Sequence, residues 1–470
     1  MLELFPQIKT MGEFANDFDE NIFNDVTNIQ WRLEESKSDS ILFYKLNENQ
    51  EDILWEKLTN LSNSNRPKIV ILNRKPKFEM SLLVNHYFIL NNVNDWSELQ
   101  KIFCDYYLPT PSGIKFIGIT GTNGKTSTVS FINQLLSFQG EDVLSIGTLG
   151  VFKNQIKLID FSLTSPSYID FRKTVFKHAL QNSYVVFEMS SHALDQDRFY
   201  KIELSAAGWT SFSQDHLDYH KTMDSYFQAK KKIIKSLLPG AHLYLPKKKQ
   251  ELFDKIQSEK VKFANFIDVN SWSTCHFLTI DFMKENLELA YAISNDVCPQ
   301  ELQKYNKCDL KNVPGRVLVK TKKGKTVVID YAHTPDALKN ICQHLSQTAT
   351  AKNGLKVLFG CGGDRDKTKR PIMGQVVSEF ASFIYVTSDN PRTEDPEKII
   401  DEIMPGILKP YYRNADRKMA IKKAMDELEI DQTLLIAGKG HEDYMIFGKE
   451  KTPYSDEDEV EKYFKDTKSI

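Results

Sequence analysis

Residues 116–128 read Phe-Ile-Gly-Ile-Thr-Gly-Thr-Asn-Gly-Lys-Thr-Ser-Thr, and this stretch decides how the middle of the chain is expected to fold. It continues an apolar run that predicts a buried strand, and apolar residues recur after it at helical spacing: Val129, Ile132, Leu135 and Leu136. A glycine-rich turn between a strand and a helix holds phosphate groups, because backbone N–H groups and the positive helix N-terminus surround the oxygens. The sequence therefore predicts a phosphate-binding loop in which Lys125 reaches the outer phosphates and Thr126 ligates magnesium.

One spacing departs from the usual form of this loop. In the usual form, a glycine is followed by four residues and then by Gly-Lys-Thr. That spacing would place the first glycine at position 119, which is Ile119, and the nearest glycines are Gly118 and Gly121. The alternative is an ordinary glycine-rich turn that carries a surface lysine. The strand before the turn and the helix after it favour the phosphate-binding loop.

Composition limits the class of protein. A chain of 470 residues suggests about three domains, and 41% apolar with 26% charged residues is typical of a globular protein. The net charge of −2 creates no field that would recruit nucleic acid or an anionic membrane. No signal peptide or membrane-spanning run is recognised, and six scattered cysteines without a Cys-x-x-Cys pair argue against structural zinc. We therefore expect a cytoplasmic protein without nucleic-acid or membrane partners, acting as a monomer.

Two sets of strand-like runs predict two separate β-sheets. The first set, separated by helical patterns, predicts a parallel sheet: residues 114–119, 142–147, 184–189 and 204–209. The second set predicts a smaller, doubly wound sheet: residues 326–331, 356–360, 383–387 and 433–437. Breaks at 108–113 and at 313–316 separate these regions from each other and from a polar, Asn-rich first segment with short apolar runs at 41–44 and 69–72.

Three motifs of the middle region carry groups that can bind a cation. Glu188 follows a strand-like run and could bind magnesium with Thr126, or could simply cap the next helix. His216 and His220 are four residues apart in Asp-His-Leu-Asp-Tyr-His, but the residue after the first histidine is leucine and not the glutamate of a hydrolytic zinc site. Lys230, in Gln-Ala-Lys-Lys-Lys-Ile, would on its own be interpreted as a surface lysine.

Four strand ends of the last region carry charged or glycine-rich turns: residues 330–336, 360–367, 389–392 and 438–442. Turns at the carboxyl ends of parallel strands meet at one edge of the sheet, which predicts a single charged crevice. Arg365 and Arg392 suit carboxylate or phosphate capture, and Glu442 suits an amine. Alternatively, Arg392 only caps a turn and pairs with Glu394 or Asp395.

Five motifs together resemble the Mur ligases, ATP-dependent amide-forming enzymes of peptidoglycan precursor synthesis and cell-wall formation: residues 120–126, 188–192, 215–220, 330–333 and 438–442. The resemblance covers about residues 109–470. It implies an α/β protein of three domains: an N-terminal UDP-sugar substrate-binding domain (1–108), a central P-loop ATPase-like parallel sheet (109–315) and a C-terminal, doubly wound Rossmann-like domain for the amino acid (316–470). The motif at 389–392 resembles the amino-acid site that selects meso-2,6-diaminopimelate.

The resemblance also implies roles for individual residues. The ATP site would comprise Thr120, Gly121, Thr122, Asn123, Gly124, Lys125, Thr126, Ser127, Asn286, Arg316, Asp330 and His333. Two magnesium ions would be held by Thr126, Glu188, His216 and Lys230 in carbamylated form. The UDP-muramyl dipeptide would contact Thr164, Ser165, Ser190, Gln196 and Arg198, and diaminopimelate would contact Arg365, Asp389, Asn390, Pro391, Arg392, Gly438 and Glu442. Catalysis would rest on Lys125, Lys230, His216, Glu188 and Arg316.

The implied reaction joins meso-diaminopimelate to the D-glutamyl carboxylate of UDP-N-acetylmuramoyl-L-alanyl-D-glutamate through an acyl phosphate. Four alternatives stay open: the same ligase using L-lysine, a folate polyglutamylating ligase, a P-loop switch or kinase, and a non-catalytic nucleotide-binding relative. The first 108 residues depart from the family pattern. Where the family carries Asp-Ser-Arg and a His-containing turn, this chain has residues 28–32 and 46–50, and only Arg32 of that pattern is kept.

Overall fold

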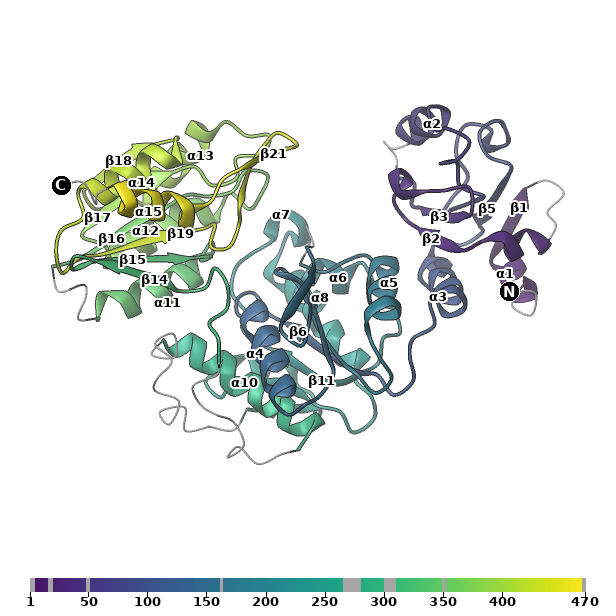
Figure 1. Cartoon of the computed structure of the whole chain (residues 1–470), viewed down its shortest axis with the longest axis horizontal. Coiled ribbons are helices and arrows are strands. Elements are labelled where there is room, and N and C mark those ends of the chain that lie inside the picture. Colours follow the sequence, from purple (N-terminus) through teal and green to yellow (C-terminus); the bar gives the residue numbers. More distant parts are fainter. Residues whose placement is uncertain are drawn as a thin grey trace. The chain divides into compact units, whose positions relative to one another are not determined.

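β6 (Lys115–Thr120) runs into the glycine-rich turn, and α4 (Lys125–Phe138) begins directly after it, as the sequence predicts. The structure, a computed structural model, describes residues 5–15, 20–47, 51–160, 164–264, 280–299, 310–348, 351 and 353–466. Contacts divide the chain into a first unit of residues 1–115, 165–185 and 193–202, and a second unit of residues 116–164, 186–192 and 203–470 (Figure 1). These units are defined by contacts and do not test the predicted domain boundaries at 108 and 315, which stay predictions.

An eight-stranded sheet surrounds β6, in the order β13-β12-β11-β6-β10-β7-β8-β9. Its other strands are β7 (Val143–Gly147), β8 (Gly150–Lys153), β9 (Ile156–Ile159), β10 (Tyr184–Glu188), β11 (Leu204–Trp209), β12 (Leu243–Leu245) and β13 (Val261–Phe263). The four predicted strands are confirmed to within one residue at each end. β6, β11, β12 and β13 pair in parallel, whereas β7, β8 and β9 form antiparallel hairpins that were not predicted.

Helices of this region connect the strands and carry the motifs: α6 (Ser191–Asp195), α7 (Leu217–His220), α8 (Met223–Lys231), α9 (Gln250–Ile256) and α10 (Asp281–Val297). α10 packs along α4, beside β6 and β11 (Figure 1). The buried side chains of α10 recur at helical spacing, among them Met283, Leu287 and Ile293.

The last region forms a six-stranded sheet in the order β14-β15-β19-β16-β17-β18. The strands are β14 (Leu318–Lys322), β15 (Lys325–Asp330), β16 (Leu355–Phe359), β17 (Phe383–Thr387), β18 (Tyr411–Asn414) and β19 (Thr433–Ala437), and only the hairpin β14–β15 is antiparallel. All four predicted strands are confirmed to within one residue. Chain order reverses around β19, which is where a doubly wound sheet opens a crevice at its carboxyl edge.

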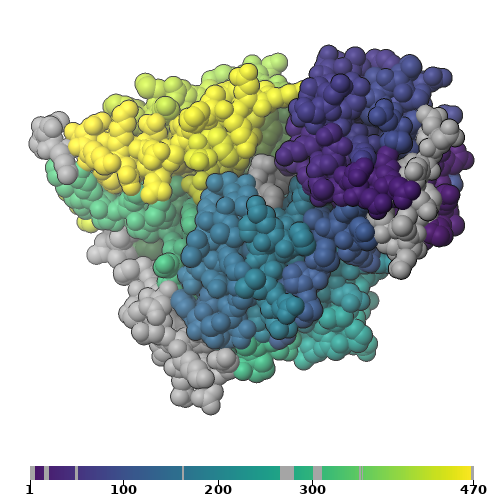
Figure 2. Space-filling view, turned by 45° about the vertical axis from the view of Figure 1, so that its right-hand side comes forward, coloured from purple at the N-terminus to yellow at the C-terminus, as the bar shows by residue number. Residues whose placement is uncertain are grey.

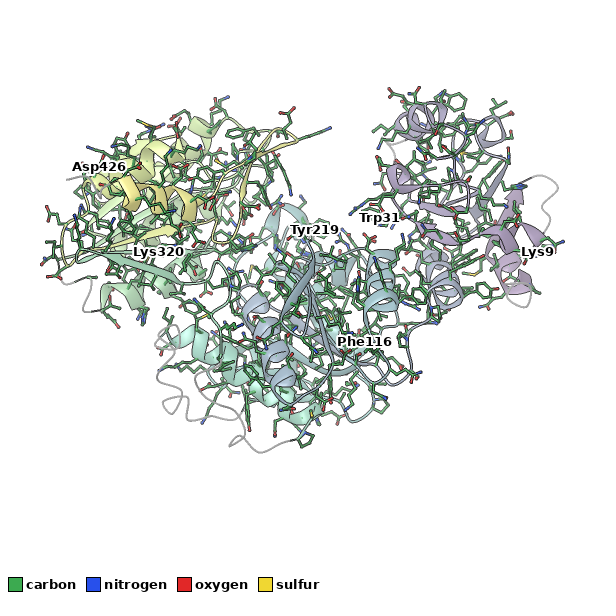
Figure 3. The ribbon with its side chains drawn as sticks, in the orientation of Figure 1. Lys9, Trp31, Phe116, Tyr219, Lys320 and Asp426 are labelled. Carbon is green, nitrogen blue, oxygen red and sulfur yellow. The ribbon has the colours of Figure 1, made fainter. Side chains whose placement is uncertain are left out.

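The helices of this region are α11 (Pro335–Ser346), α12 (Lys369–Phe380), α13 (Pro396–Ile403), α14 (Arg417–Asp426) and α15 (Asp456–Asp466). A separate hairpin of β20 (Tyr444–Phe447) and β21 (Glu450–Pro453) lies between β19 and α15 in the chain. Three of the helices of this sheet, α11, α13 and α14, start at residues whose side chains cap them. Thr334 and Asp395 cap α11 and α13, and each precedes a proline at the first helical position. Lys320 on β14 and Asp426 on α14 mark this region in Figure 3.

The first unit has a five-stranded sheet in the order β1-β5-β4-β3-β2. The strands are β1 (Gly12–Ala15), β2 (Asn28–Gln30), β3 (Ser40–Tyr44), β4 (Ile69–Leu72) and β5 (His86–Leu90), with α1 (Phe5–Met11), α2 (Glu51–Thr59), α3 (Trp96–Tyr107) and α5 (Tyr168–His178). The two apolar runs of this region form β3 and β4, and Figure 2 shows its surface in purple and blue. Arg172 of α5 is buried and donates to the Asp105 carboxylate and to the Leu108 carbonyl, which joins α5 to the end of α3.

Cys104, Cys342 and Cys361 are buried free thiols, and the Cys298 thiol donates to the Glu141 carboxylate at 3.5 Å. Cys275 and Cys308 lie outside the described residues. Burial raises the pKa of the Cys361 thiol to about 12, and the same cause raises that of Cys104 to about 12. Within the described ranges, no helix combines the length and the apolar content that crossing a membrane requires.

Candidate functional site

The glycine-rich loop has a backbone that only glycine adopts without strain. Gly121 and Gly124 have φ values of 149° and 90°. A Cβ atom at Gly121 would clash with the hydroxyl of Thr210, and one at Gly124 would clash with the amide of Asn286. The loop is therefore pressed against the end of β11 and against α10, which leaves its N–H groups at the start of α4 in the geometry of a phosphate cradle.

Lys125, the first residue of α4, folds its side chain back over this loop. Its Nζ donates to the carbonyl oxygens of Gly121 and Thr122, both at 2.9 Å. Burial lowers the pKa of Lys125, although the nearby carboxylates of Glu188 and Asp215 act in the opposite direction. Neutral carbonyls do not compensate the ammonium charge, so the oxygens of a phosphate group would be stronger partners.

Thr126 and Glu188 lie side by side, although they are 62 residues apart in sequence. The Thr126 hydroxyl donates to Glu188 Oε1 at 3.0 Å, and the backbone N–H of Thr148 donates to the same oxygen at 2.7 Å. The Glu188 carboxylate is only 1% exposed. A hydroxyl and a carboxylate at this distance are hard oxygen donors, so these residues fit a magnesium ion. In the part of the chain that the structure describes, no group of three or more His, Cys, Asp or Glu side chains is arranged to hold a metal ion.

Arg316, which precedes the C-terminal sheet in the chain, places a second cation beside Thr126. Its NH2 group lies 3.4 Å from the Thr126 hydroxyl, and its guanidinium stacks over the Tyr331 ring at 4.5 Å. Its buried Nε has no hydrogen-bond partner among the described residues. A buried donor without an acceptor is costly, so Arg316 fits an anionic ligand well.

His216 lies in the left-handed region, with φ of 56°, directly before α7. Burial lowers its pKa to about 3, and neighbouring His192, Lys230 and Lys125 act in the same direction against Asp215. A neutral imidazole results at neutral pH, which is the form that binds metals. His220, at the other end of α7, has its Nε2 2.9 Å from the Ser191 hydroxyl.

Asp215 is buried and forms an ion pair with Lys369 at 3.0 Å. Burial would raise its pKa, but Lys369, His216 and His333 together hold the pKa well below its usual range. The pair joins the middle sheet to α12 next to His216. Asp215 is therefore a fixed negative charge at the edge of the phosphate loop.

Lys230 on α8 is not the surface lysine that its sequence context alone suggests. It is 1% exposed, and its Nζ donates to the Gly121 carbonyl at 2.7 Å over the ring of Tyr226. Burial and the charge of Lys125 lower its pKa well below the ordinary value, against a weaker effect of Asp215. This shift favours the uncharged amine, which is the form that carbamylation requires.

Asp330 and His333, two residues predicted to lie around the nucleoside, are held by hydrogen bonds to the backbone. Asp330 accepts hydrogen bonds from the N–H groups of Val317 and Ala332 at 2.9 and 2.8 Å, and burial raises its pKa against the effect of Arg316. The Nδ1 atom of His333 lies 2.8 Å from the Tyr331 carbonyl, and burial lowers the pKa of His333 to about 4.

At the other end of the site, Arg392 also has a left-handed backbone, with φ of 53°. Its NH1 group donates to the carbonyls of Gly363 at 2.7 Å and Asn390 at 3.4 Å. It does not pair with Glu394, which binds Arg370 and Lys367, or with Asp395, which caps α13. The predicted pairing with Glu394 or Asp395 is therefore wrong, whereas the two carbonyl contacts agree with a turn-capping role. The other guanidinium nitrogens of Arg392 have no partner in the described residues.

Arg365 lies near Arg392, and within the described part of the chain its guanidinium donates only to the carbonyl of Asp364, at 2.9 Å. Burial and the charge of Arg365 lower the pKa of Arg392, against Asp389, Glu442 and Asp364. Across from them, Glu442 Oε2 accepts from Lys439 and from Asn390, at 2.9 and 2.8 Å. This end of the site therefore presents two arginines that have no carboxylate partner in the described residues, together with the carboxylates of Glu442 and Asp389.

One cavity of about 310 Å³ brings most of the predicted residues together: Thr122, Asn123, Gly124, Lys125, Thr126, Ser127, Thr164, Glu188, His216, Asn286, Arg316, Asp330, His333, Arg365, Asp389, Asn390, Arg392, Gly438 and Glu442. Five predicted residues of the second unit do not line it: Thr120, Gly121, Ser190, Lys230 and Pro391. Lys230 lies behind the loop instead, against Gly121.

The residues predicted to contact the muramyl dipeptide are divided between the two units. Thr164 and Ser190 belong to the second unit, and the Thr164 hydroxyl accepts from that of Thr148 at 3.1 Å. Ser165, Gln196 and Arg198 belong to the first unit. There Arg198 donates to the Ser165 carbonyl at 2.8 Å and to Gln196 Oε1 at 2.8 and 3.1 Å.

Several residues of the site were not singled out from the sequence. Thr148 holds Glu188, and Lys369 holds Asp215. Thr148 directly follows the end of β7, so the rule that functional residues follow strand ends could have found it. Lys369 follows the motif at 360–367 but lies on a helix, and its partner is 154 residues away, so no local signal marks it.

Comparisons with known proteins agree with this geometry. Residues 119–291 match the Mur ligase middle domain, and residues 315–440 match the Mur ligase glutamate ligase domain. A UDP-N-acetylmuramoyl-L-alanyl-D-glutamate–2,6-diaminopimelate ligase of Rickettsia bellii (strain RML369-C) is 38% identical over 72% of this chain and 78% of its own length. The ligase of that name from Clostridium tetani (strain Massachusetts / E88) is 33% identical over 94% of this chain and 95% of its own. A solved structure of a ligase with this name is 25% identical, with a TM-score of 0.55 over 95% of this chain and 96% of that chain.

Proposed function

The chain belongs to the Mur ligase family, and we propose that it joins meso-2,6-diaminopimelate to UDP-N-acetylmuramoyl-L-alanyl-D-glutamate in an ATP-dependent, ADP-forming step of peptidoglycan precursor synthesis. The observation that carries the proposal is the single cavity described above. It has a phosphate loop at one end and, at the other, two arginines without carboxylate partners opposite a carboxylate. Diaminopimelate has two carboxylates and two amines, and this set of groups complements it.

Residues 122–127 would cradle the phosphates of ATP, and Lys125 with Arg316 would compensate their charge. Both cations are partly buried and both have only neutral hydrogen-bond partners in the described residues, so phosphate oxygens would improve their environment. Asn286, Asp330 and His333 would surround the nucleoside, because they line the same cavity as the phosphate loop.

Thr126 and Glu188 would hold one magnesium ion, and His216 with carbamylated Lys230 would hold a second. Bound magnesium would neutralise charge on the phosphoryl group that is transferred. Carbamylation forms a bond from the Lys230 nitrogen to the carbon of CO2, with loss of one proton from the nitrogen. The burial of Lys230 supports this step, because burial favours the unprotonated amine and only an unprotonated amine can attack CO2.

In the proposed reaction, the D-glutamyl carboxylate attacks the γ-phosphorus of ATP, the bond to ADP breaks, and an acyl phosphate forms. An amine of diaminopimelate then attacks the carbonyl carbon, phosphate leaves, and the nitrogen loses a proton. The protein would contribute position and charge compensation, and exclusion of water from the site would protect the acyl phosphate. We expect this chemistry in the cytoplasm, on a monomer, and size-exclusion chromatography with light scattering tests the monomer.

The UDP-muramyl dipeptide would contact Thr164, Ser165, Ser190, Gln196 and Arg198. The UDP end would meet the carboxyl edge of the N-terminal sheet, where Trp31 follows β2 (Figure 3). There the Trp31 indole donates to the Asp170 carboxylate at 2.7 Å, and Arg32 stacks over the Trp31 ring at 4.7 Å. Aromatic and guanidinium faces of this kind are suited to a nucleobase.

The test is phosphate release measured with the UDP-muramyl dipeptide and each of a panel of amino acids, with the product identified by mass spectrometry. We expect release only when dipeptide, ATP and meso-diaminopimelate are all present. Equal use of L-lysine would favour the lysine-adding alternative, and glutamate addition to a folate would favour a folate ligase. Release without any amino acid would contradict the proposal.

A further inference from the structure

Lys439 is a fully buried lysine in the turn 438–442, at 0% exposure, and it was not among the predicted site residues. Its Nζ donates to Glu442 Oε2 at 2.9 Å and to Asn390 Oδ1 at 3.2 Å. The rings of Tyr444 and Tyr454 lie 5.7 and 6.0 Å from it. A buried ammonium requires such partners, so its position is fixed by them.

The contact with Lys439 fixes the orientation of the Asn390 amide. Asn390 Oδ1 accepts from two donors, the Lys439 ammonium and the backbone N–H of Ile446, the latter at 3.0 Å. A flipped amide would place its NH2 group against both donors. The Asn390 NH2 group must therefore point the other way, toward Glu442 Oε2, which it reaches at 2.8 Å.

As a result, the two oxygens of Glu442 have different roles. Oε2 accepts from both Lys439 and Asn390, whereas Oε1 has one long contact, 3.4 Å from the Tyr331 hydroxyl. Glu442 lines the cavity. The carboxylate is thus held at one oxygen and retains acceptor capacity at the other.

We propose that Lys439 is a positioning residue of the amino-acid site: together with Asn390 it clamps Glu442 Oε2 and so presents Glu442 Oε1 to an ammonium group of the incoming amino acid. The inference rests on the proposed function, because it assumes that this end of the cavity binds an amino acid. The contrasting role is a purely structural one, in which Lys439 only compensates buried negative charge.

A double-mutant cycle separates these roles. Lys439→Met, Glu442→Gln and the double variant are compared in the full-length enzyme by kcat/KM for meso-diaminopimelate, by KM for ATP and by melting temperature. We expect each single variant to lose roughly 10- to 150-fold in kcat/KM for diaminopimelate, the loss typical of a charged hydrogen bond, with the KM for ATP unchanged. The double variant should lose little more than Glu442→Gln alone, because Lys439 acts through Glu442.

Lys451→Met is the matched control, since Lys451 lies 4.0 Å from the same Tyr444 ring but contacts neither Asn390 nor Glu442. It should leave kcat/KM unchanged. Multiplicative losses in the double variant, or equal losses toward ATP and diaminopimelate, would overturn the clamp. If Lys439→Met does not fold, Asn390→Ala in the same cycle tests the other half of the clamp, with the same refuting outcome. If the wild-type enzyme uses a different amino acid, the proposed function fails, and the cycle run on that amino acid still decides about Lys439.

Discussion

Removing the Arg392 side chain should abolish the choice of meso-diaminopimelate over L-lysine. The two amino acids differ by one carboxylate on the far carbon. Arg392 uses NH1 on the carbonyls of Gly363 and Asn390, so its other nitrogens remain for that carboxylate. Two hydrogen bonds from a half-buried guanidinium to a carboxylate are worth about 2–4 kcal/mol, which corresponds to roughly 30- to 1,000-fold in kcat/KM.

The assay is phosphate release by wild type and Arg392→Ala with each amino acid in turn. We expect the variant to lose about 30- to 1,000-fold on meso-diaminopimelate and little on L-lysine, which never had the far carboxylate. Because both amino acids are measured on one variant, any disturbance of the turn at Gly363 cancels in the ratio. Alanine and arginine pay similar costs for a φ of 53°, so the variant should fold.

Arg413→Ala provides the control, since Arg413 is a half-exposed arginine in the same region that pairs with Glu397 and Asp401. It should change neither kcat/KM value. The reasoning would be refuted if wild type used L-lysine as well as meso-diaminopimelate. It would also be refuted if Arg392→Ala lowered both values by the same factor.

Three further predictions follow from the phosphate end of the site and from the charges around it. Lys125→Ala should lower turnover by at least about 100-fold without changing the melting temperature, and turnover near the wild-type level would contradict the phosphate loop. Lys230→Ala should be severely impaired and partly restored by short carboxylates, whereas a mass spectrum of active wild type without a CO2 adduct would count against the carbamate. Hydrogen bonding from Arg370 lowers the pKa of Glu394 to about 2 against the effect of burial, so Glu394 stabilises the fold above its unfolded value of 4.5 and this stability is lost as the pH falls toward 2. Urea unfolding at pH 5 and pH 3 should show a smaller loss of stability in Glu394→Gln than in wild type, and equal losses would refute that assignment.

The sequence predicts the parts of this fold that depend on local pattern. Apolar runs bounded by glycine and proline identified eight of the strands of the two larger sheets, and turns at strand ends identified most residues of the cavity. The short strands β12 and β13 and the hairpin β8–β9 lack such runs, since β9 carries Lys157 between exposed apolar residues. In the N-terminal sheet, only the apolar runs that form β3 and β4 were singled out, because polar, Asn-rich connections separate its strands.

Lys230 shows why tertiary contacts could not be read from the same pattern. It stands in a run of three lysines at the end of α8, and neighbouring Lys231 and Lys232 are partly exposed as expected. Only the approach of the phosphate loop buries Lys230, because Gly121 comes from a strand end 109 residues earlier. The left-handed backbone of Arg392 is likewise set by its bonds to the hairpin β20–β21, which include its N–H to the Ile446 carbonyl at 3.0 Å.

The charges around the phosphate loop explain how the fold tolerates so many cations in one place. Lys369 is neutralised by Asp215, and burial together with the charge of Lys125 lowers the pKa of Lys230. Around the phosphate loop, Lys125 and Arg316 donate hydrogen bonds only to neutral groups among the described residues. Binding of an anion relieves their repulsion, and any ligand that binds the native state alone stabilises it. The same depressed pKa that lets Lys230 be buried without a counter-charge also makes its nitrogen reactive toward CO2, so stability of the unliganded fold and formation of the carbamate have one physical cause.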